Sequence, residues 1–309
     1  MTPRPLELFD LPKLPRLRDE IVSLDCAQIL TRGNPLRAVN FLAHLNPTKR
    51  IYTAIHEGEA GQVVLGSIRQ QEGEKFARMT YLAPEYAPAS GLLLLVEELV
   101  AHAKAWGVHQ VVAEVQEDSP VFAPLRQSGF SIYARQRVWE ISKINVADVQ
   151  RVYWRRSKDI DSFSVQRLLH QIVPPLLQPI ESFYQVKRGL VCEKAELLAY
   201  IDTLYGRRGI FLRPLIHPNT DKVDKKLRSL LARNLANRHD RPVYFCVRSY
   251  QAWIEPILEE VEANVGPRQV LMVKHLAGTQ RAEKTIPAGA DKAWANPAAP
   301  IRSTKIKVK

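Results

Sequence analysis

The sequence lacks the long apolar runs, paired cysteines and metal-binding motifs that would at once assign it to a class of protein. Its longest apolar run, Gly91–Val96, is far shorter than the roughly 20 residues of a membrane helix. No apolar segment follows Met1–Pro5, so we expect no secretory signal. The three cysteines (Cys26, Cys192 and Cys246) form no CxxC pair, and their odd number argues against a disulfide framework. The eight histidines show no HExxH pattern. These absences predict a reduced, cytoplasmic protein without a membrane span or a metal site.

The positive charge of the chain, +12 in total, is concentrated in two segments. Residues 207–241 hold ten basic residues against three acidic ones, a net +7, and residues 282–309 hold six against two, a net +4. Such an excess of positive charge is typical of proteins that bind nucleic acid, an anionic membrane surface or a phosphate-bearing small molecule. It is equally typical of a solvated helix face with a solubilising tail. The first segment has few aromatic residues, and the sequence shows no helix-turn-helix or zinc-finger spacing. Both observations argue against nucleic-acid binding.

The first half of the chain alternates between strand and helix patterns. With 309 residues, 46% apolar and 25% charged, the chain suits two globular domains. Three β-favouring runs separated by short glycine-containing turns predict an antiparallel meander. A long amphipathic helix between two strands predicts that those strands are parallel neighbours. The expected elements are a strand at 5–8, a helix that starts at 10–14, further helix through 38–42, strands at 51–56, 62–70 and 75–82, a helix at 92–106, a strand at 108–115, a helix at 120–127 and a strand at 131–141.

The second half repeats this plan, with strands at 186–194, 196–204 and 209–217, a helix at 223–235, a strand at 242–248, a helix at 254–262 and a strand at 269–275. A shift of 133 residues places Val111 on Tyr244 and Gln136 on Gln269. A nearly constant offset across several elements in one order indicates an internal duplication. We therefore predict two mixed-sheet domains at 1–145 and 151–278. The Ala-, Pro- and Lys-rich composition of 282–309 predicts a disordered basic tail.

This order of elements resembles the GNAT (N-acetyltransferase) superfamily. Leu82–Tyr86 is similar to the end of the family's fourth strand, and the segment from Val96 to Val108 to its long helix and the turn that follows. Ser128–Phe130 resembles the Gly-Phe before its last strands. The resemblance covers nearly all of 1–145 and, more faintly, 151–278. It implies an α/β (α+β mixed-sheet) fold with two tandem GNAT-like acyl-CoA acyltransferase domains.

The resemblance also implies acetyl-CoA as the cofactor. In the family, backbone N–H groups of a glycine-containing loop before the long helix hold the CoA pyrophosphate. Here the three motif positions of that loop become Ala87, Ser90 and Leu92, while in the second half they are Asp221, Asp224 and Lys226. Both loops lack the motif glycines, so we expect the binding of acetyl-CoA to be weak or absent. We expect any such binding in the first half rather than in the second. The residues expected to hold the cofactor are Leu82, Ala83, Ala87, Ala89, Ser90, Gly91 and Leu92.

The proton-transfer residues of the family are also missing. The position of its frequent general-acid tyrosine becomes Leu125 in the first half and Leu258 in the second. In the family, the fourth strand often carries a glutamate that acts as the general base. The corresponding strands here, 75–82 and 210–217, hold no acidic residue. Tyr81, Tyr133 and His217 are the nearest titratable substitutes, and each is also explained as a half-buried side chain with one hydrogen bond. The sequence therefore assigns no catalytic residue.

Two functions of different class follow. One is N-acetyltransfer from acetyl-CoA to a small-molecule or peptide amine, whose site the resemblance places between the early helices and the last hairpin. The other is a non-catalytic tandem GNAT-fold module for binding or interaction, in which the cofactor site is eroded. Function depends on sites rather than on the fold alone, so both remain open.

Overall fold

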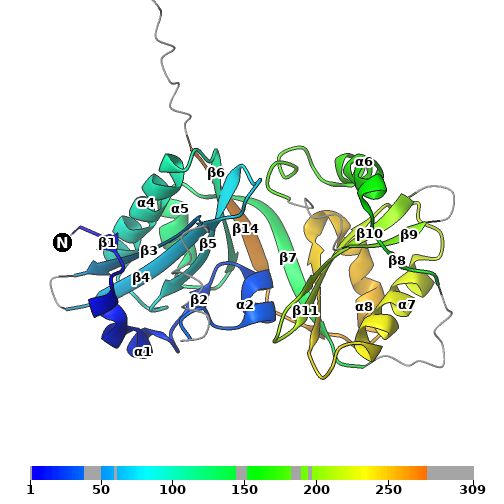
Figure 1. Ribbon diagram of the computed structural model, residues 1–309, viewed down its shortest axis with the longest axis horizontal. Coiled ribbons are helices and arrows are strands. Elements are labelled where there is room, and N and C mark those ends of the chain that lie inside the picture. The colour runs from blue at the N-terminus through cyan, green and yellow to red at the C-terminus, as the bar shows by residue number, and fades with distance from the viewer. Residues whose placement is uncertain are drawn as a thin grey trace, which may run out of the picture. The chain divides into compact units, whose positions relative to one another are not determined.

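The computed structural model describes residues 2–37, 50–58, 61–143, 152–181, 189–193 and 197–276 (Figure 1). The described elements belong to one compact unit, residues 1–277. The first half holds β1 (Arg4–Pro5), the 3-10 helix η1 (Leu8–Lys13), α1 (Leu14–Leu17), β2 (Val22–Ser23), α2 (Cys26–Arg32), β3 (Arg50–Glu57), β4 (Val63–Gln70), β5 (Phe76–Ala83), α4 (Ala89–Ala105), β6 (Gln110–Gln116), α5 (Phe122–Gln127) and β7 (Ser131–Ile141). The second half holds β8 (Arg155–Arg156), the 3-10 helix η4 (Asp159–Asp161), α6 (Ser162–Ile172), β9 (Leu190–Glu193), β10 (Leu197–Tyr205), β11 (Ile210–Ile216), α7 (Val223–Ala236), β12 (Val243–Arg248), the 3-10 helix η6 (Ser249–Ile254), α8 (Glu255–Glu260), β13 (Asn264–Val265) and β14 (Gln269–His275).

The predicted meanders, long helices and closing strands of both halves are confirmed. The start of the chain differs, because the strand is only Arg4–Pro5 and residues 8–13 form a 3-10 helix. The helices expected through 38–42 and the tail expected at 282–309 lie outside the described residues. So does the expected boundary between the domains, residues 146–150.

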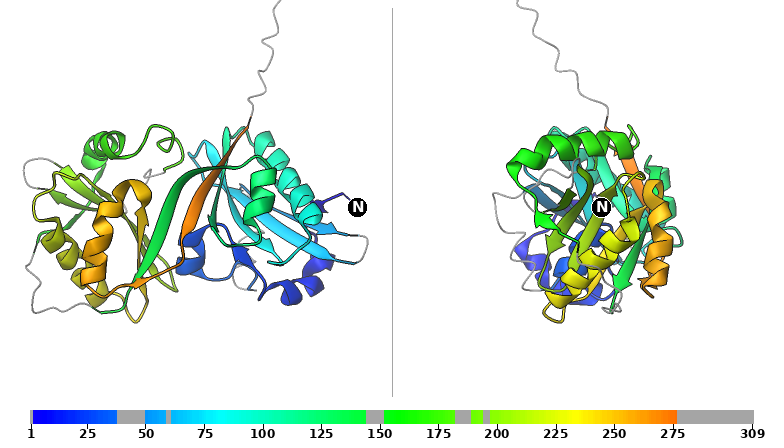
Figure 2. Two further views of the ribbon diagram at one scale, coloured as in Figure 1. Left: turned by 180° about the vertical axis from the view of Figure 1, so that it is seen from behind. Right: turned by 90° about the vertical axis from the view of Figure 1, so that its right-hand side faces the viewer.

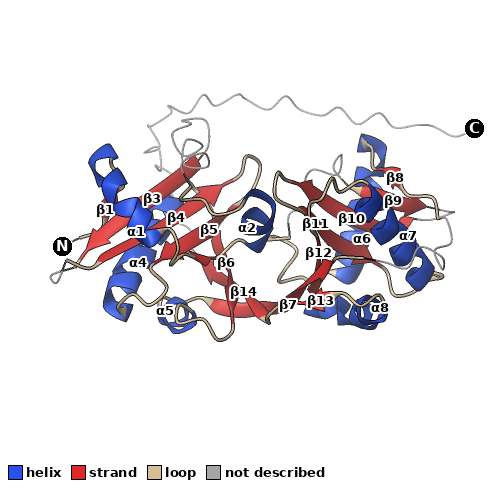
Figure 3. Ribbon diagram, turned by 90° about the horizontal axis from the view of Figure 1, so that it is seen from below, coloured by secondary structure: helices blue, strands red, loops and turns tan. Residues whose placement is uncertain are grey.

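The two predicted mixed-sheet halves are joined through one continuous sheet. The fourteen described strands form one sheet, in the order β1-β3-β4-β5-β6-β14-β7-β12-β11-β10-β9-β8, with β2 beside β5 and β13 beside β7. Each half exchanges its last strand with the other, since β14 lies between β6 and β7 while β7 pairs with β12 (Figures 2 and 3). From either end towards the middle of the sheet, equivalent strands of the two halves follow in the same order. Val111 on β6 and Tyr244 on β12 therefore occupy equivalent strands.

The two exchanged strands meet at the residue pair that the duplication relates. Gln136 on β7 is directly opposite Gln269 on β14. The side-chain amide of Gln136 donates to Oε1 of Gln269 over 2.8 Å. Residues 133 apart in the repeat thus face each other, which places an approximate twofold axis of the duplication at this pair.

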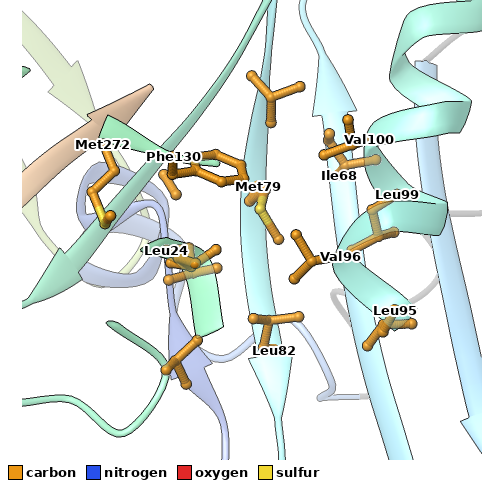
Figure 4. Close-up of a cluster of buried hydrophobic side chains, with 14 of the residues drawn as sticks. Leu24, Ile68, Met79, Leu82, Leu95, Val96, Leu99, Val100, Phe130 and Met272 are labelled. Carbon is orange, nitrogen blue, oxygen red and sulfur yellow. The ribbon is translucent and has the colours of Figure 1, made fainter. Parts of the chain in front are cut away.

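Each half has an apolar cluster of its own, and two further clusters contain residues of both halves. In the first half α4 packs on β3 and β4, and its buried face includes Leu95, Val96 and Leu99 (Figure 4). Gly66 on β4 allows this close approach, because an added Cβ would lie 2.7 Å from Leu82 Cδ2. In the second half α7 and α8 cover one face of the sheet with Leu227 and Leu258, while α6 belongs to a cluster on the other face.

A short charged turn occurs in both halves at a different offset, 151 residues. Arg4 forms two hydrogen bonds of 2.7 Å with Asp10, and Arg155 forms bonds of 2.7 and 2.8 Å with Asp161. Each aspartate also accepts the N–H of the residue three positions before it. The arginine in each turn lowers the pKa of its aspartate below the usual range, although burial opposes the shift. The duplication therefore extends to the first residues of each half.

Candidate functional site

The central parallel strands of the first half diverge towards their carboxyl ends. Strands β5 and β6 are paired only where Phe76–Arg78 lies beside Gln110–Val112, and beyond these residues the two strands separate. An opening between parallel strands, beside the start of the connecting helix, is where open α/β sheets bind their ligands. Here that opening adjoins the N-terminus of α4.

The chain itself fills this opening with the segment Val22–Cys26. Val22 and Ser23 form β2 and pair with Leu82 and Tyr81 on β5. The next residue, Leu24, donates its N–H to the Thr80 carbonyl over 2.9 Å and accepts the N–H of Glu114 on β6 over 2.9 Å. The segment is therefore hydrogen-bonded to both diverging strands.

The second half has the same divergence and a different filling. Strands β11 and β12 pair only from Ile210–Leu212 to Val243–Phe245. The fully buried side chain of Gln251 then completes the edge of β11. Its amide nitrogen donates to the Pro214 carbonyl, and its oxygen accepts the N–H of Ile216, both over 2.8 Å.

A cavity of about 600 Å³ lies at the carboxyl end of β6 between α2 and β13, and we name it the α2–β13 cavity. Among the described residues, its charged lining consists of two glutamates, Glu85 and Glu140, with no lysine or arginine. Burial, followed by the negative charge of Glu140, raises the pKa of Tyr244, so this phenol stays protonated at neutral pH. The full lining is Ile21, Val22, Ser23, Cys26, Ile29, Leu30, Glu85, Gln116, Ser119, Val138, Glu140, Tyr244, Asn264, Val265, Gly266, Pro267 and Gln269.

No protein-family model and no curated protein matches the sequence. Solved structures, in contrast, match over most of the chain. A GCN5-related N-acetyltransferase from Sphaerobacter thermophilus is 13% identical with a TM-score of 0.57, over 88% of this chain and 95% of that one. A tandem GNAT protein from the clavulanic acid biosynthesis pathway is 16% identical with a TM-score of 0.50, over 88% of this chain and 98% of that one. The chain has a tandem GNAT fold. At these identities the likeness shows the fold alone.

Within the tandem GNAT fold, four of the seven expected cofactor residues differ in their exposure. Leu82 and Ala83 end β5 and are fully buried, and Leu82 is paired on both sides, with Gly66 and Val22. Ala89 and Ser90 are exposed at the start of α4, which has no side-chain cap. The structure therefore leaves the helix start accessible while it closes the adjoining strand.

Three further expected residues serve the packing of α4. Gly91 is buried, and an added Cβ would lie 3.2 Å from Val64 Cγ2 and 3.4 Å from the His56 ring, so the glycine permits contact with the sheet. Leu92 belongs to the core, and its N–H donates to the Pro88 carbonyl over 3.1 Å. Ala87 packs against the same core cluster. The one glycine near the expected loop thus has a structural role at this position.

The corresponding loop of the second half, before α7, also carries side chains at the positions where the family has glycines. Lys222 adopts a left-handed conformation with a φ of 51° and precedes the first residue of α7. Asp221 and Asp224 are exposed, whereas Lys226 is buried with 9% of its surface accessible. The long side chain of Lys226 lies where the family needs a glycine.

The structure does not bring the three titratable substitutes together. Burial raises the pKa of Tyr81, whose side chain lies in the cluster of α1 on the other face of β5 from α4. The hydroxyl of Tyr133 is hydrogen-bonded to His275, and Nδ1 of His217 accepts the N–H of Asn219 over 3.1 Å. None of the three lines the α2–β13 cavity.

Buried charges connect the two halves near the twofold axis. Arg248 on β12 lies 2.9 Å from Glu181 and 3.2 Å from Glu114 on β6, and Arg213 on β11 lies 2.9 Å from Glu181. A cavity of about 130 Å³ beside this cluster is lined by four arginines, Arg69, Arg78, Arg213 and Arg248, and by four acids, Asp25, Glu74, Glu114 and Asp202. Because these charges balance, the cavity favours neither an anion nor a cation.

The described residues contain no group of three or more His, Cys, Asp or Glu side chains suited to a metal ion. No helix in the same part of the chain has the length and apolar character to cross a membrane. The three cysteines are free thiols, all buried.

The sequence did not reveal the closing groups or the cavity. A strand of two residues has no periodicity, and the role of Gln251 depends on a fold that brings it to β11. Glu85 does lie in the quoted motif Leu82–Tyr86, but its partner Glu140 is far from it along the chain. The Arg-x5-Asp turn is visible in the sequence, because it recurs near the start of each half. Its residues, however, do not line the cavity.

Proposed function

We propose that this protein is a ligand-binding module with a tandem GNAT fold, and that its ligand is a small organic cation such as a primary amine. The observation that carries this proposal is the α2–β13 cavity, whose charged lining is made of two glutamates. A cation entering the cavity is stabilised by these carboxylates, whereas an anion is repelled. The apolar lining residues, including Ile29, Leu30 and Val265, suit a hydrocarbon body.

The volume of the cavity sets the size of the ligand. About 600 Å³ lies within the range of small-molecule pockets, roughly 300–1,000 Å³. The cavity lies between α2, an early helix, and β13, which pairs with β7. The family resemblance places an acceptor amine beside the early helices. The chemistry of the lining and the position of the cavity thus support the same class of ligand.

The test compares 2-phenylethylamine with the neutral 2-phenylethanol, which has the same apolar body. We expect calorimetry to show binding of the amine at least about tenfold tighter than of the alcohol, a difference of about 1.4 kcal/mol. Replacing Glu85 and Glu140 together by glutamine should remove this preference. Glu97→Gln, on the exposed face of α4, is the matched control and should leave it unchanged. Equal binding of amine and alcohol would contradict the proposal.

Acyl transfer from acetyl-CoA to the same amine is the second candidate function. The uncapped start of α4 favours it, because exposed N–H groups at a helix N-terminus attract phosphate. The residues along β5 do not fit the cofactor, since Val22–Cys26 already occupies the strand edge. Calorimetry with acetyl-CoA and with desulfo-CoA separates the candidates. Binding of either compound in the micromolar range would favour the acyltransferase.

A further inference from the structure

We infer that the protein's own groups take the place of an acyl-CoA arm in both halves, so that neither half accepts this cofactor. The inference goes beyond the proposed amine site and does not depend on it. It concerns the backbone edges of β5 and β11 where these strands diverge from β6 and β12. An extended ligand in such an opening must hydrogen-bond to these edges, and both edges already have partners.

In the first half the occupant is a backbone segment that is anchored to both β5 and β6. The backbone of Leu24 is hydrogen-bonded to Thr80 and Glu114. Two residues later, the N–H of Cys26 donates to the Glu114 carboxylate over 3.0 Å. The Leu24 side chain is 1% exposed and lies in the core cluster with Met79 and Met272 (Figure 4). To admit a ligand arm, the protein would have to break these hydrogen bonds and expose this leucine to water.

In the second half the occupant is a single side chain. A primary amide carries the same donor and acceptor as a peptide group, so Gln251 can imitate a neighbouring strand. It does so at both ends of the amide, towards Pro214 and Ile216. Its complete burial leaves no room at that edge for a second amide group.

The two closures act at equivalent positions. Thr80 and Pro214 are 134 residues apart, and each carbonyl accepts a hydrogen bond from the closing group. A buried carbonyl without a partner is costly, so an edge that no ligand completes has to be completed by the chain. The same problem is solved twice by unrelated groups, once by a backbone segment and once by a side chain.

The first closure also forms part of the ligand cavity. Val22, Ser23 and Cys26 line the α2–β13 cavity on one side and close the opening between β5 and β6 on the other. Opening that slot would therefore remove a wall of the cavity. It follows that a ligand in the cavity and a cofactor arm in the slot oppose each other.

Amide hydrogen exchange and calorimetry test this inference on the full chain. In the unmodified protein the amides of Leu24, Glu114 and Ile216 should exchange at least about a thousandfold more slowly than unstructured amides. Acetyl-CoA at about 1 mM should neither change these rates nor release measurable heat, as expected for a dissociation constant well above this concentration. Micromolar binding together with faster exchange at Leu24 or Ile216 would overturn the inference, because the slot would then open for the cofactor.

A variant makes the second closure testable on its own. Gln251→Ala should speed the exchange of the Ile216 amide at least about tenfold, while the Leu24 amide stays protected. Gln178→Ala, which removes another hydrogen-bonded glutamine of the same half, should leave Ile216 unchanged. An unchanged Ile216 in Gln251→Ala would mean that Gln251 does not close the strand edge. Failure of the amine to bind leaves all these rates unaffected, so the two proposals can fail separately.

Discussion

Replacing Glu181 by glutamine should destabilise the protein more than any surface substitution. The carboxylate is fully buried and lies 2.9 Å from both Arg248 and Arg213, and it accepts the hydroxyl of Tyr250 over 3.2 Å. Removing one partner of a buried ion pair costs about 3–5 kcal/mol. Because Arg248 retains Glu114 and Arg213 retains Asp202, we expect the lower end, about 3 kcal/mol.

Urea denaturation at neutral pH measures this difference, and a thermal melt should show a loss of roughly 6–12 °C. Glu262→Gln is the matched control, because Glu262 and its partner Lys143 are 77% and 80% exposed, and it should cost less than about 0.5 kcal/mol. A loss in Glu181→Gln no larger than in the control would refute the reasoning, since the buried cluster would then give no net stabilisation.

The same variant has a defined pH dependence. Burial alone would raise the pKa of Glu181, but Arg248 and Arg213 outweigh it and the pKa lies below its usual value. A carboxylate with a lowered pKa in the folded state stabilises the protein above its unfolded pKa, about 4.3, and loses this effect as the pH falls through the folded pKa. The difference between wild type and Glu181→Gln should therefore shrink as the pH is lowered below about 4.

Two further predictions concern packing and the end of the chain. Gly66→Ala should cost about 1–3 kcal/mol in urea denaturation, because its Cβ would lie 2.7 Å from Leu82 Cδ2 and 3.0 Å from Leu99 Cδ1. Gly58→Ala, where the nearest atom is 3.7 Å away, should be close to neutral, and equal losses in both variants would contradict the packing argument. Truncation after Gln280 should leave the melting temperature within about 2 °C, as expected from the Ala-, Pro- and Lys-rich composition that predicts a disordered tail at 282–309. A larger loss would show that residues 281–309 stabilise the fold.

The sequence predicted the elements of this fold well because their signals are local. The turns between the meander strands contain glycine and polar residues, and the face of α4 follows the helical period through Leu92, Leu95 and Leu99. The offset of 133 residues correctly related β6 to β12. These signals depend on neighbours along the chain and need no knowledge of the partners of an element.

The exchange of the last strands could not be predicted in this way. Strands β7 and β14 are equivalent in the repeat, so the apolar pattern of either one suits the same position beside β6 or β12. The choice between them depends on contacts between residues that are distant in the sequence. The pattern therefore indicates a strand but not the neighbour with which it pairs.

The candidate site was predicted less well than the fold, for a related reason. The sequence located the loop before α4, but whether the adjoining slot is open depends on Leu24 and Gln251, which approach it from other parts of the chain. Gly91 illustrates the difficulty, since a glycine that permits helix packing looks the same in a sequence as one that admits a phosphate.

The position of β14 has a consequence for synthesis of the protein. Its residues 269–275 pair with residues 110–116 on β6, so this contact spans more of the chain than any pairing within one half. While the ribosome is still translating the second half, the first half lacks the strand that covers β6, and that edge is available to any passing β-strand. A nascent chain that stops before residue 269 would have lost a central strand of its first half. Late frameshifts and stop codons should therefore produce aggregation-prone fragments, although the missing residues are so close to the end of the described chain.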